Sequence, residues 1–294
     1  MRTKILTAIA LAVCLTATAL HAQRQLTLLA TVTDPGGGEI ATVSPAEVKF
    51  SENDTDGKIL SVEPVNTVPK VQILVDNGIG TGGESLSDVR NGVRGLLEAL
   101  PPGIEITLVT TAPQPRFLER ATTDREKLLE AVDRLTPDTG AGRFAESLNE
   151  ATGRIDKDKN GRYTIITLGS TSGDTEVRER DVQQTIQRVS QRGTTVHVVI
   201  LTSTRRTASG GILQAELGQM LAANSGGRFE QVNAGSRVAT LLPEIGAQVA
   251  KTIGGSSRQF RIVVERPNGA SGDLGKLSLG VIAKIVSSVS IEQE

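Results

Sequence analysis

The amino-acid sequence predicts an α/β fold: a mostly parallel sheet with helices on both faces, and a small antiparallel β subdomain built from both flanks. Between residues 71 and 254, short runs rich in β-branched residues alternate with amphipathic helical patterns. This alternation is typical of parallel strands joined by right-handed crossovers. Residues 24–66 and 258–292 instead alternate apolar and polar positions around turn signals, as antiparallel strands do. We expect these two flanks to pair with each other.

The predicted strands of the central part are short apolar segments, at 71–75, 104–110, 163–168, 195–201 and 228–232. The predicted helices place apolar residues three and four positions apart, which sets one stripe against a core, over 86–100, 123–135, 144–155, 182–189, 213–221 and 238–253. Thr123 and Glu126 form a capping box that predicts the start of the second helix. Ligands bind such sheets at the carboxyl ends of the strands, so Asp76 is the first candidate for a binding site.

The first 22 residues have the features of a cleaved secretory signal. Arg2 and Lys4 precede an apolar segment over residues 5–20, and a small residue stands before the expected cut. An apolar stretch of about 16 residues is shorter than the roughly 20 that cross a membrane, and no later segment is long enough. We therefore expect an exported protein, periplasmic or extracellular, with no integral membrane span. Cys14 would leave with the signal, which excludes disulfides and Cys-ligated zinc in the exported chain.

Charge is balanced along the chain. The sequence holds 32 basic and 33 acidic side chains, and they form no long runs of one sign. A nucleic-acid-binding surface requires clustered basic residues, so the sequence predicts no nucleic-acid partner. A balanced surface favours a protein partner.

The segment "VQILVDNGIGTGGES", residues 71–85, contains a literal G-x-G-x-x-G over residues 78–83. In the dinucleotide fingerprint the first glycine follows the strand directly, but here Asp76 and Asn77 stand between them. An acid that would hold the ribose is also missing after the strand at 104–110. No lysine follows the glycines, which excludes a phosphate-binding loop of the NTPase kind. The sequence therefore does not predict nucleotide binding.

Motifs for hydrolytic enzymes are missing as well. The sequence contains neither G-x-S-x-G nor H-E-x-x-H. After removal of the signal, His197 is the one remaining histidine, and it stands between Val196 and Val198, which is typical of a residue in a core or at a sheet edge. We expect no enzymatic activity; an enzyme that uses the crevice at the strand ends is kept as an alternative.

Residues 52–63 partly match a calcium-binding EF-hand loop, with acids at positions 1, 3 and 5, glycine at 6 and glutamate at 12. Position 1 is Glu52 rather than aspartate, and Pro45 and Pro64 disfavour the helices that flank such a loop. The segment is predicted to be the turn of a β-hairpin, with calcium binding as the alternative.

A strand that ends in Asp76, a loop, an amphipathic helix and later strands in this order resemble the von Willebrand factor type A domain over residues 71–254. The flanking segments "LTLLATVTDPGGGEI" and "PAEVKFSENDTDGKILSVEPV" resemble the β-rich part ahead of the domain in exported bacterial VWFA-related proteins. The resemblance implies a Rossmann-like fold and a protein-interaction module of the adhesion or scaffold kind.

In that family, loops at the strand ends hold Mg²⁺ in a metal-ion-dependent adhesion site: D-x-S-x-S after the first strand, a threonine in a later loop, and a second aspartate. A carboxylate of the partner completes the octahedral coordination. On this sequence the motif begins at Asp76, but Gly78 and Gly80 replace the serines, Gly142 falls at the threonine and Ser170 at the second aspartate. The resemblance therefore implies a degenerate site, and we expect no cofactor and no metal.

Two alternatives follow from the same loops. A rearranged site could bind Mg²⁺ or Ca²⁺, with Asp76, Asn77 and Ser170 as candidate ligands, extended by Thr139 or Asp174. Without a metal, the same loops remain the candidate surface for a protein partner. The residues of this surface are Asp76, Asn77, Gly78, Gly80, Thr139, Gly142, Arg143, Ser170 and Asp174. Neither the identity of the partner nor the oligomeric state follows from the sequence.

Overall fold

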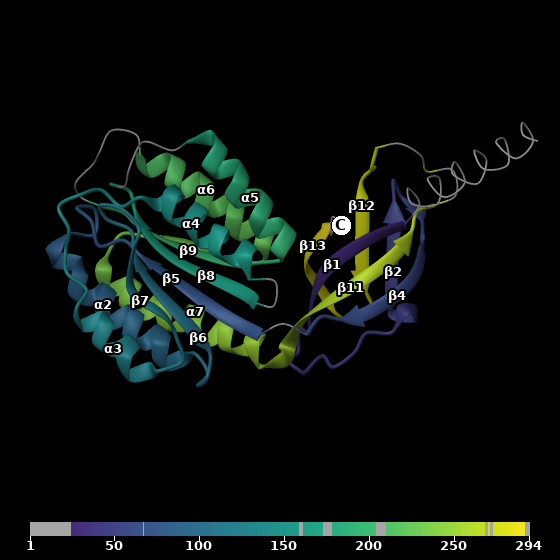
Figure 1. Cartoon of the computed structure of the whole chain (residues 1–294), viewed down its shortest axis with the longest axis horizontal. Coiled ribbons are helices and arrows are strands. Elements are labelled where there is room, and N and C mark those ends of the chain that lie inside the picture. The colour runs from purple at the N-terminus through teal and green to yellow at the C-terminus, as the bar shows by residue number, and fades with distance from the viewer. Residues whose placement is uncertain are drawn as a thin grey trace, which may run out of the picture. The chain divides into compact units, whose positions relative to one another are not determined.

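The computed structural model describes residues 25–66, 68–158, 161–172, 178–203, 210–267, 270 and 273–291. The predicted signal, residues 1–22, lies outside this described part. The chain forms two compact units (Figure 1). The unit called here the α/β unit comprises 36–39 and 66–257; the β unit comprises the described residues of 1–35, 40–65 and 258–294. In the described part of the chain, no helix combines the length and the hydropathy that a membrane crossing requires.

The α/β unit is built around one six-stranded sheet. Its strands are β5 (Val68–Val75), β6 (Glu105–Thr110), β7 (Arg116–Thr122), β8 (Gly161–Ser170), β9 (Thr195–Leu201) and β10 (Phe229–Val232). They lie in the order β10-β9-β8-β5-β6-β7, and every neighbouring pair is parallel except β6 with β7. The predicted α/β fold with a mostly parallel sheet is thus confirmed.

Helices cover both faces of this sheet (Figure 1). They are α2 (Gly82–Ala99), α3 (Arg125–Asp133), α4 (Phe144–Lys157), α5 (Glu179–Arg192), α6 (Gly210–Ser225) and α7 (Gly235–Lys251), which continues into the π-turn η2 (Thr252–Ser256). Alternate residues of β5 serve the two faces: Val71 and Ile73 pack with α2, α3 and α7, whereas Leu74 packs with α4, α5 and α6. This alternation follows from the two-residue repeat of a strand.

Two local predictions need correction. No strand was predicted over β7, whose residues are mostly exposed or half-buried, because an edge strand with charged side chains on both faces lacks an apolar signature. The predicted capping box of Thr123 is wrong: Asp124 caps α3, and its Oδ1 accepts hydrogen bonds from the backbone N–H groups of Glu126 (3.1 Å) and Lys127 (3.2 Å). Either residue type satisfies the unpaired amides of a first helical turn.

The β unit contains two antiparallel sheets, ordered β13-β1-β11-β4 and β12-β2-β3. The elements are β1 (Gln25–Thr33), the 3₁₀-helix η1 (Pro45–Glu47), β2 (Val48–Glu52), β3 (Thr55–Asp56), β4 (Lys58–Pro64), β11 (Ser257–Glu265), β12 (Leu277–Val281) and β13 (Ile285–Ile291). The pairs β1 with β13, β2 with β12 and β4 with β11 each join an early segment of the chain to a late one. Leu28, Phe260 and Ile262 are fully buried in the core between them.

The segment with the calcium-loop pattern forms the β2–β3 turn. Asn53 and Asp54 take left-handed backbone conformations there (φ 49° and 61°). Glu52 is buried, and its Oε2 and Oε1 accept hydrogen bonds from Nε and Nη2 of Arg266 at 2.8 and 2.7 Å. The backbone N–H of Gly275 donates a further bond to Oε1 (2.8 Å). The first acid of the pattern is therefore bound to an arginine inside the protein.

Candidate binding site at the carboxyl edge of the sheet

Asp76 lies where the sequence analysis placed it, directly after β5 and at the centre of the sheet. Its backbone N–H continues the strand ladder by donating to the carbonyl oxygen of Leu168 in β8 (2.9 Å). Only 2% of the residue is exposed. Residues 77–81 then lead into α2, so the carboxylate sits beneath the loops that connect strands to helices.

The Asp76 carboxylate is held by uncharged hydrogen-bond donors. Its Oδ1 accepts from the backbone N–H of Gly78 (2.8 Å), and its Oδ2 accepts from the hydroxyl of Ser170 at the end of β8 (2.7 Å). Burial raises the pKa of Asp76 above its ordinary value, and these hydrogen bonds offset only part of that rise. Asp76 is thus a buried acid, and within the described residues no cation forms a direct ion pair with it.

Three glycines surround this carboxylate at positions where any side chain would collide. A Cβ on Gly142 would lie 2.5 Å from Oδ1 of Asp76, and one on Gly78 would lie 2.5 Å from the carbonyl oxygen of Gly140. A Cβ on Gly80 would overlap the hydroxyl of Ser170. Glycine allows backbone to approach where other residues cannot. Here the backbone of the 140–142 loop occupies the space directly against Asp76.

Asn77 fixes the neighbouring loops to one another. Its Nδ2 donates to the carbonyl oxygen of Thr136 (2.9 Å), its Oδ1 accepts from the backbone N–H of Ala112 (3.3 Å), and its own carbonyl accepts from the N–H of Asp138 (2.7 Å). One side chain thereby connects the loop after β5, the loop after β6 and the loop before α4. These bonds hold together the loops that contain Gly78, Gly80 and Gly142, called here the glycine cradle, which cover Asp76.

The residues predicted to bind a partner differ in exposure. Six of them are buried and shape the loops from within: Asp76, Asn77, Gly78, Gly80, Gly142 and Ser170. Thr139 is exposed, and Arg143 is half-buried, with its Nε donating to the carbonyl oxygen of Pro113 (3.3 Å). Asp174 lies outside the described residues. Among the described members of the predicted set, Thr139 and Arg143 are the two that are not buried.

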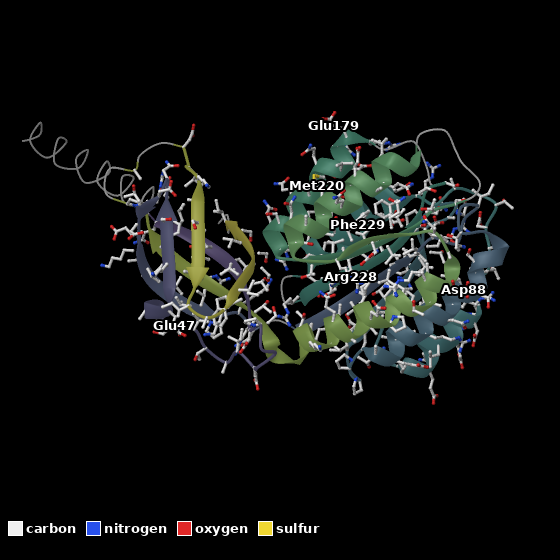
Figure 2. All side chains as sticks on the ribbon, turned by 180° about the vertical axis from the view of Figure 1, so that it is seen from behind. Glu47, Asp88, Glu179, Met220, Arg228 and Phe229 are labelled. Carbon is white, nitrogen blue, oxygen red and sulfur yellow. The ribbon has the colours of Figure 1, made fainter. Side chains whose placement is uncertain are left out.

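A polar pocket of about 410 Å³ lies beside this cradle. Its lining residues are Ile79, Gly80, Thr81, Gly83, Ser85, Pro137, Asp138, Thr139, Leu201, Thr202, Ser203, Asn233, Ala234 and Gly235. The first turns of α2 and α7 both contribute to it, and no side chain caps either helix. The Asp88 carboxylate (Asp88 is labelled in Figure 2) lies against Gly235, 2.7 Å from the position that a Cβ would take there. A negative charge at this place stabilises α7, because the N-terminus of a helix carries a partial positive charge.

The loops that line this pocket are called here the rim. The sequence analysis did not predict the part of the rim formed by residues 201–203 and 233–235. These segments follow β9 and β10, both of which were predicted as strands. The general rule that ligands bind at the carboxyl ends of parallel strands would have identified them. They contain no acidic residue, so the metal-binding pattern does not indicate them.

The residues at the adhesion-site positions do not fit a hard divalent cation. Mg²⁺ requires about six oxygen ligands in octahedral arrangement. These positions provide two side chains with oxygen atoms, Asp76 and Ser170, and the two are hydrogen-bonded to each other. The backbone at Gly142 also lies directly against the carboxylate, since a Cβ there would stand 2.5 Å from Oδ1 of Asp76. Among the described residues, no group of three or more His, Cys, Asp or Glu side chains is arranged to hold a metal ion.

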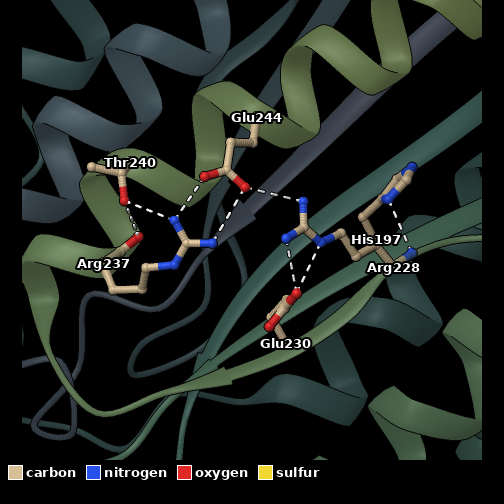
Figure 3. Close-up of polar contacts among 6 residues, drawn as sticks. All are labelled: His197, Arg228, Glu230, Arg237, Thr240 and Glu244. Atoms are coloured by element: carbon tan, nitrogen blue, oxygen red, sulfur yellow. Dashed lines mark hydrogen bonds and ion pairs between the residues drawn. The ribbon is translucent and has the colours of Figure 1, made fainter.

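His197 belongs to a separate polar cluster at β9, β10 and α7 (Figure 3). The ring is buried, and its Nδ1 accepts a hydrogen bond from the backbone N–H of Arg228 (3.1 Å). Burial, together with the charge of Arg228, lowers the pKa of His197 to about 4. The guanidinium of Arg228 binds Glu230 and Glu244, and Glu244 also binds Arg237. His197 is thus a neutral core residue at neutral pH.

Comparison with known proteins agrees with this architecture. The family model of the von Willebrand factor type A domain matches residues 71–241. Among solved structures, a von Willebrand factor type A protein from Catenulispora acidiphila is 14% identical, with a TM-score of 0.53, 91% of this chain covered and 73% of that one. At such identity the likeness shows the fold alone.

Two further structures share this fold at lower identity. One is proximal thread matrix protein 1 from the mussel byssus with a zinc-occupied MIDAS motif (9% identity, TM-score 0.51, 69% of this chain and 50% of that one). The other is a variant of the PilB minor pilin from Streptococcus sanguinis (9%, 0.50, 64% and 62%). No curated protein matches the sequence.

Proposed function

Because the chain belongs to the von Willebrand factor type A family, whose domains commonly mediate protein–protein interaction, we propose that it is an exported adhesion or scaffold module. It binds a protein partner through the loops at the carboxyl edge of its six-stranded sheet. Binding requires no metal ion, and the module catalyses no reaction. The signal-like residues 1–22 support export, to the periplasm or to the outside of the cell.

One observation carries the metal-independent part of the proposal. The Gly142 backbone lies against the Asp76 carboxylate so closely that a Cβ at that position would stand 2.5 Å from Oδ1. The second carboxylate oxygen is bound by Ser170. A cation would have to displace both contacts and then find most of its ligands in water, so the protein would add little affinity over the solvent.

The surface that meets the partner is the exposed part of the same loops. Thr139 and Arg143 extend from the loop before α4, and the lining of the pocket beside Thr139 includes the polar residues Ser85 and Thr202. A polar protein segment that enters the pocket would meet the accessible side chains of Thr139 and Thr202, which favours recognition by hydrogen bonds rather than by an ion.

Calorimetric titration of Mg²⁺, Mn²⁺ and Ca²⁺ into the purified protein tests metal independence. We expect no saturable heat from any of the three ions at millimolar concentration. Saturable binding that is lost in Asp76→Ala would show that the site works with a rearranged set of ligands. Binding that persists in Asp76→Ala would place the ion elsewhere, and loss of that binding in Glu52→Gln would identify the β2–β3 turn.

Site-specific photo-crosslinking in intact cells tests the interaction surface. A photoreactive maleimide on Thr139→Cys, in a Cys14→Ser background, reports contacts at the rim, and the same probe on Gln187→Cys reports the exposed face of α5. We expect a discrete adduct from position 139 and none of the same mass from position 187. Equal adducts from both positions, or none from either, would contradict recognition through the rim.

A further inference from the structure

Strand β13 forms an edge of the four-stranded sheet in the β unit. It pairs with β1 on one side, and within the described residues no strand pairs with its other side. Its sequence, IVSSVSI, contains no charge, no proline and no glycine. Such a strand presents open backbone donors and acceptors together with high β-propensity, which is the combination that recruits another strand.

Two other edge strands of the described chain carry the charges that usually prevent such pairing, whereas β12, an edge of the three-stranded sheet, carries a glycine and no charge. β4, at the opposite edge of the same sheet, carries Lys58 and Glu63. β7, at one edge of the six-stranded sheet, carries Arg116, Glu119 and Arg120. The contrast within one chain separates β13 from edges that are protected by charge.

Exposed apolar side chains gather near the same strand. Nine large apolar residues are exposed in the described chain, and four of them lie within residues 274–289: Leu274, Ile282, Ile285 and Val289. Ile285 opposes Thr33 and Val289 opposes Ala30, so these two side chains project to opposite faces of the sheet. Val289 is the exposed one that lies on the face of the core.

Val289 is exposed on the side of β13 that faces away from β1. It stands opposite Ala30 in β1, and directly opposed residues project to the same face of a sheet. Ala30 is fully buried in the core, whereas 39% of Val289 is exposed. The difference arises because a strand flanks Ala30 on each side, while Val289 has a strand on one side only.

We propose that β13 pairs antiparallel with β13 of a second copy of this chain. A bulge at Ser287 interrupts the pairing with β1, so Ser288 to Ile291 form the regular part of the edge. A two-fold axis at Ser290 sets Val289 of each copy opposite Ile291 of the other, on the face that continues the core. The pairing is isologous, and no like charges oppose each other because the strand has none.

Sedimentation equilibrium over micromolar to near-millimolar concentrations tests the proposal. The protein is expressed from Gln23 onward, so that the apolar segment over residues 5–20 does not contribute to association. We expect a concentration-dependent dimer in the unmodified chain. Val289→Lys should raise the dimer dissociation constant at least about tenfold, because the pairing would have to bury two like charges. Val68→Lys, an exposed valine on β5 of the other unit, should leave the constant unchanged.

A chain that stays monomeric at every concentration would overturn the proposal, and so would Val289→Lys protein that dimerises like the unmodified chain. Circular dichroism and thermal melting of the variant establish that it is folded. If Val289→Lys fails to fold, Val289→Thr provides the second test, since threonine keeps the strand propensity and removes apolar contact. Neither result bears on recognition through the rim around Thr139, so the two proposals stand or fall separately.

Discussion

The hydroxyl of Ser170 donates a 2.7 Å hydrogen bond to the Asp76 carboxylate, across 94 residues of sequence. The two residues end neighbouring parallel strands, β8 and β5, at the carboxyl edge of the sheet. In a metal-dependent member of the family, side chains at these two positions share a cation. In this protein one of them binds the other directly, and the bond closes the site from within.

Gly142→Ala is expected to destabilise the protein. The added Cβ would lie 2.5 Å from Oδ1 of Asp76, so the 140–142 loop or the carboxylate must move, at a cost of roughly 1–3 kcal/mol. Gly83→Ala is the matched control, because a Cβ at that helical position meets no atom within 4 Å. Urea denaturation of both variants measures the free energy of unfolding. Equal stability of the two variants would contradict the close packing at Gly142.

Asp76→Asn is expected to change how stability depends on pH. Burial raises the pKa of Asp76, so the native state holds the proton more tightly than the unfolded chain, whose aspartates titrate near about 4. This contribution is fully present below that value and is lost as pH rises through the raised native pKa. The stability of wild type relative to Asp76→Asn should therefore fall with rising pH above about 4. A difference that is flat or rises would be inconsistent with a raised pKa.

His197→Gln is expected to show the opposite trend. The pKa of His197 is lowered to about 4, so the unfolded chain binds the proton first as pH falls below about 6.5. Its contribution is present above that value and is lost as pH falls toward 4, up to about 3 kcal/mol in all. Urea denaturation across this range should show a steeper loss in the wild type than in His197→Gln. Parallel curves would show that the ring is accessible to protons in the folded state.

Asn77→Ala is expected to loosen the loops around the site. The substitution leaves the buried N–H of Ala112 without its acceptor and removes the bond to Thr136, at about 1–3 kcal/mol for the unsatisfied buried group. Hydrogen exchange should accelerate in peptides that cover residues 109–114 and 134–142. Asn233→Ala, at an exposed position of the same rim, should leave that exchange unchanged; an equal effect of both would argue against a specific role for Asn77.

Arg266→Met is expected to destabilise the β unit strongly. It leaves the buried Glu52 carboxylate without its cation, and breaking a buried pair in this way costs about 3–5 kcal/mol. Lys284→Met removes a more exposed pair with Glu47 and should cost less than about 1 kcal/mol. Thermal unfolding compares the two variants. Similar shifts for both would indicate that burial adds little to the Glu52–Arg266 pair.

The sequence predicts the central strands well because β-branched runs such as 195–201 are buried on both faces and carry the signal themselves. β7 was not predicted, because its position depends on antiparallel pairing with β6 at the sheet edge. Its own sequence, RFLERAT, does not alternate apolar and polar residues. The Asp76 position also follows from the sequence, because it comes directly after a recognisable strand.

The closed cradle could not be predicted in the same way. Gly142 was recognised as a replaced ligand, but its approach to Asp76 depends on how two distant loops pack. The same holds for the buried state of Asn77, whose partners lie 35 and 59 residues away. A local sequence pattern shows which hydrogen-bonding atoms a side chain has. Which residues bind those atoms depends on how distant segments pack in the fold.

The pairing of β1 with β13 has a consequence for biosynthesis. Every strand of the α/β unit lies within residues 68–232 and can assemble while the later chain is still being made. β1 is synthesised before the α/β unit, whereas its neighbours in the sheet, β11 and β13, are synthesised after that unit. The sheet of the β unit therefore completes only after β13 has been made, and β1 stays without its neighbours while the whole α/β unit is synthesised.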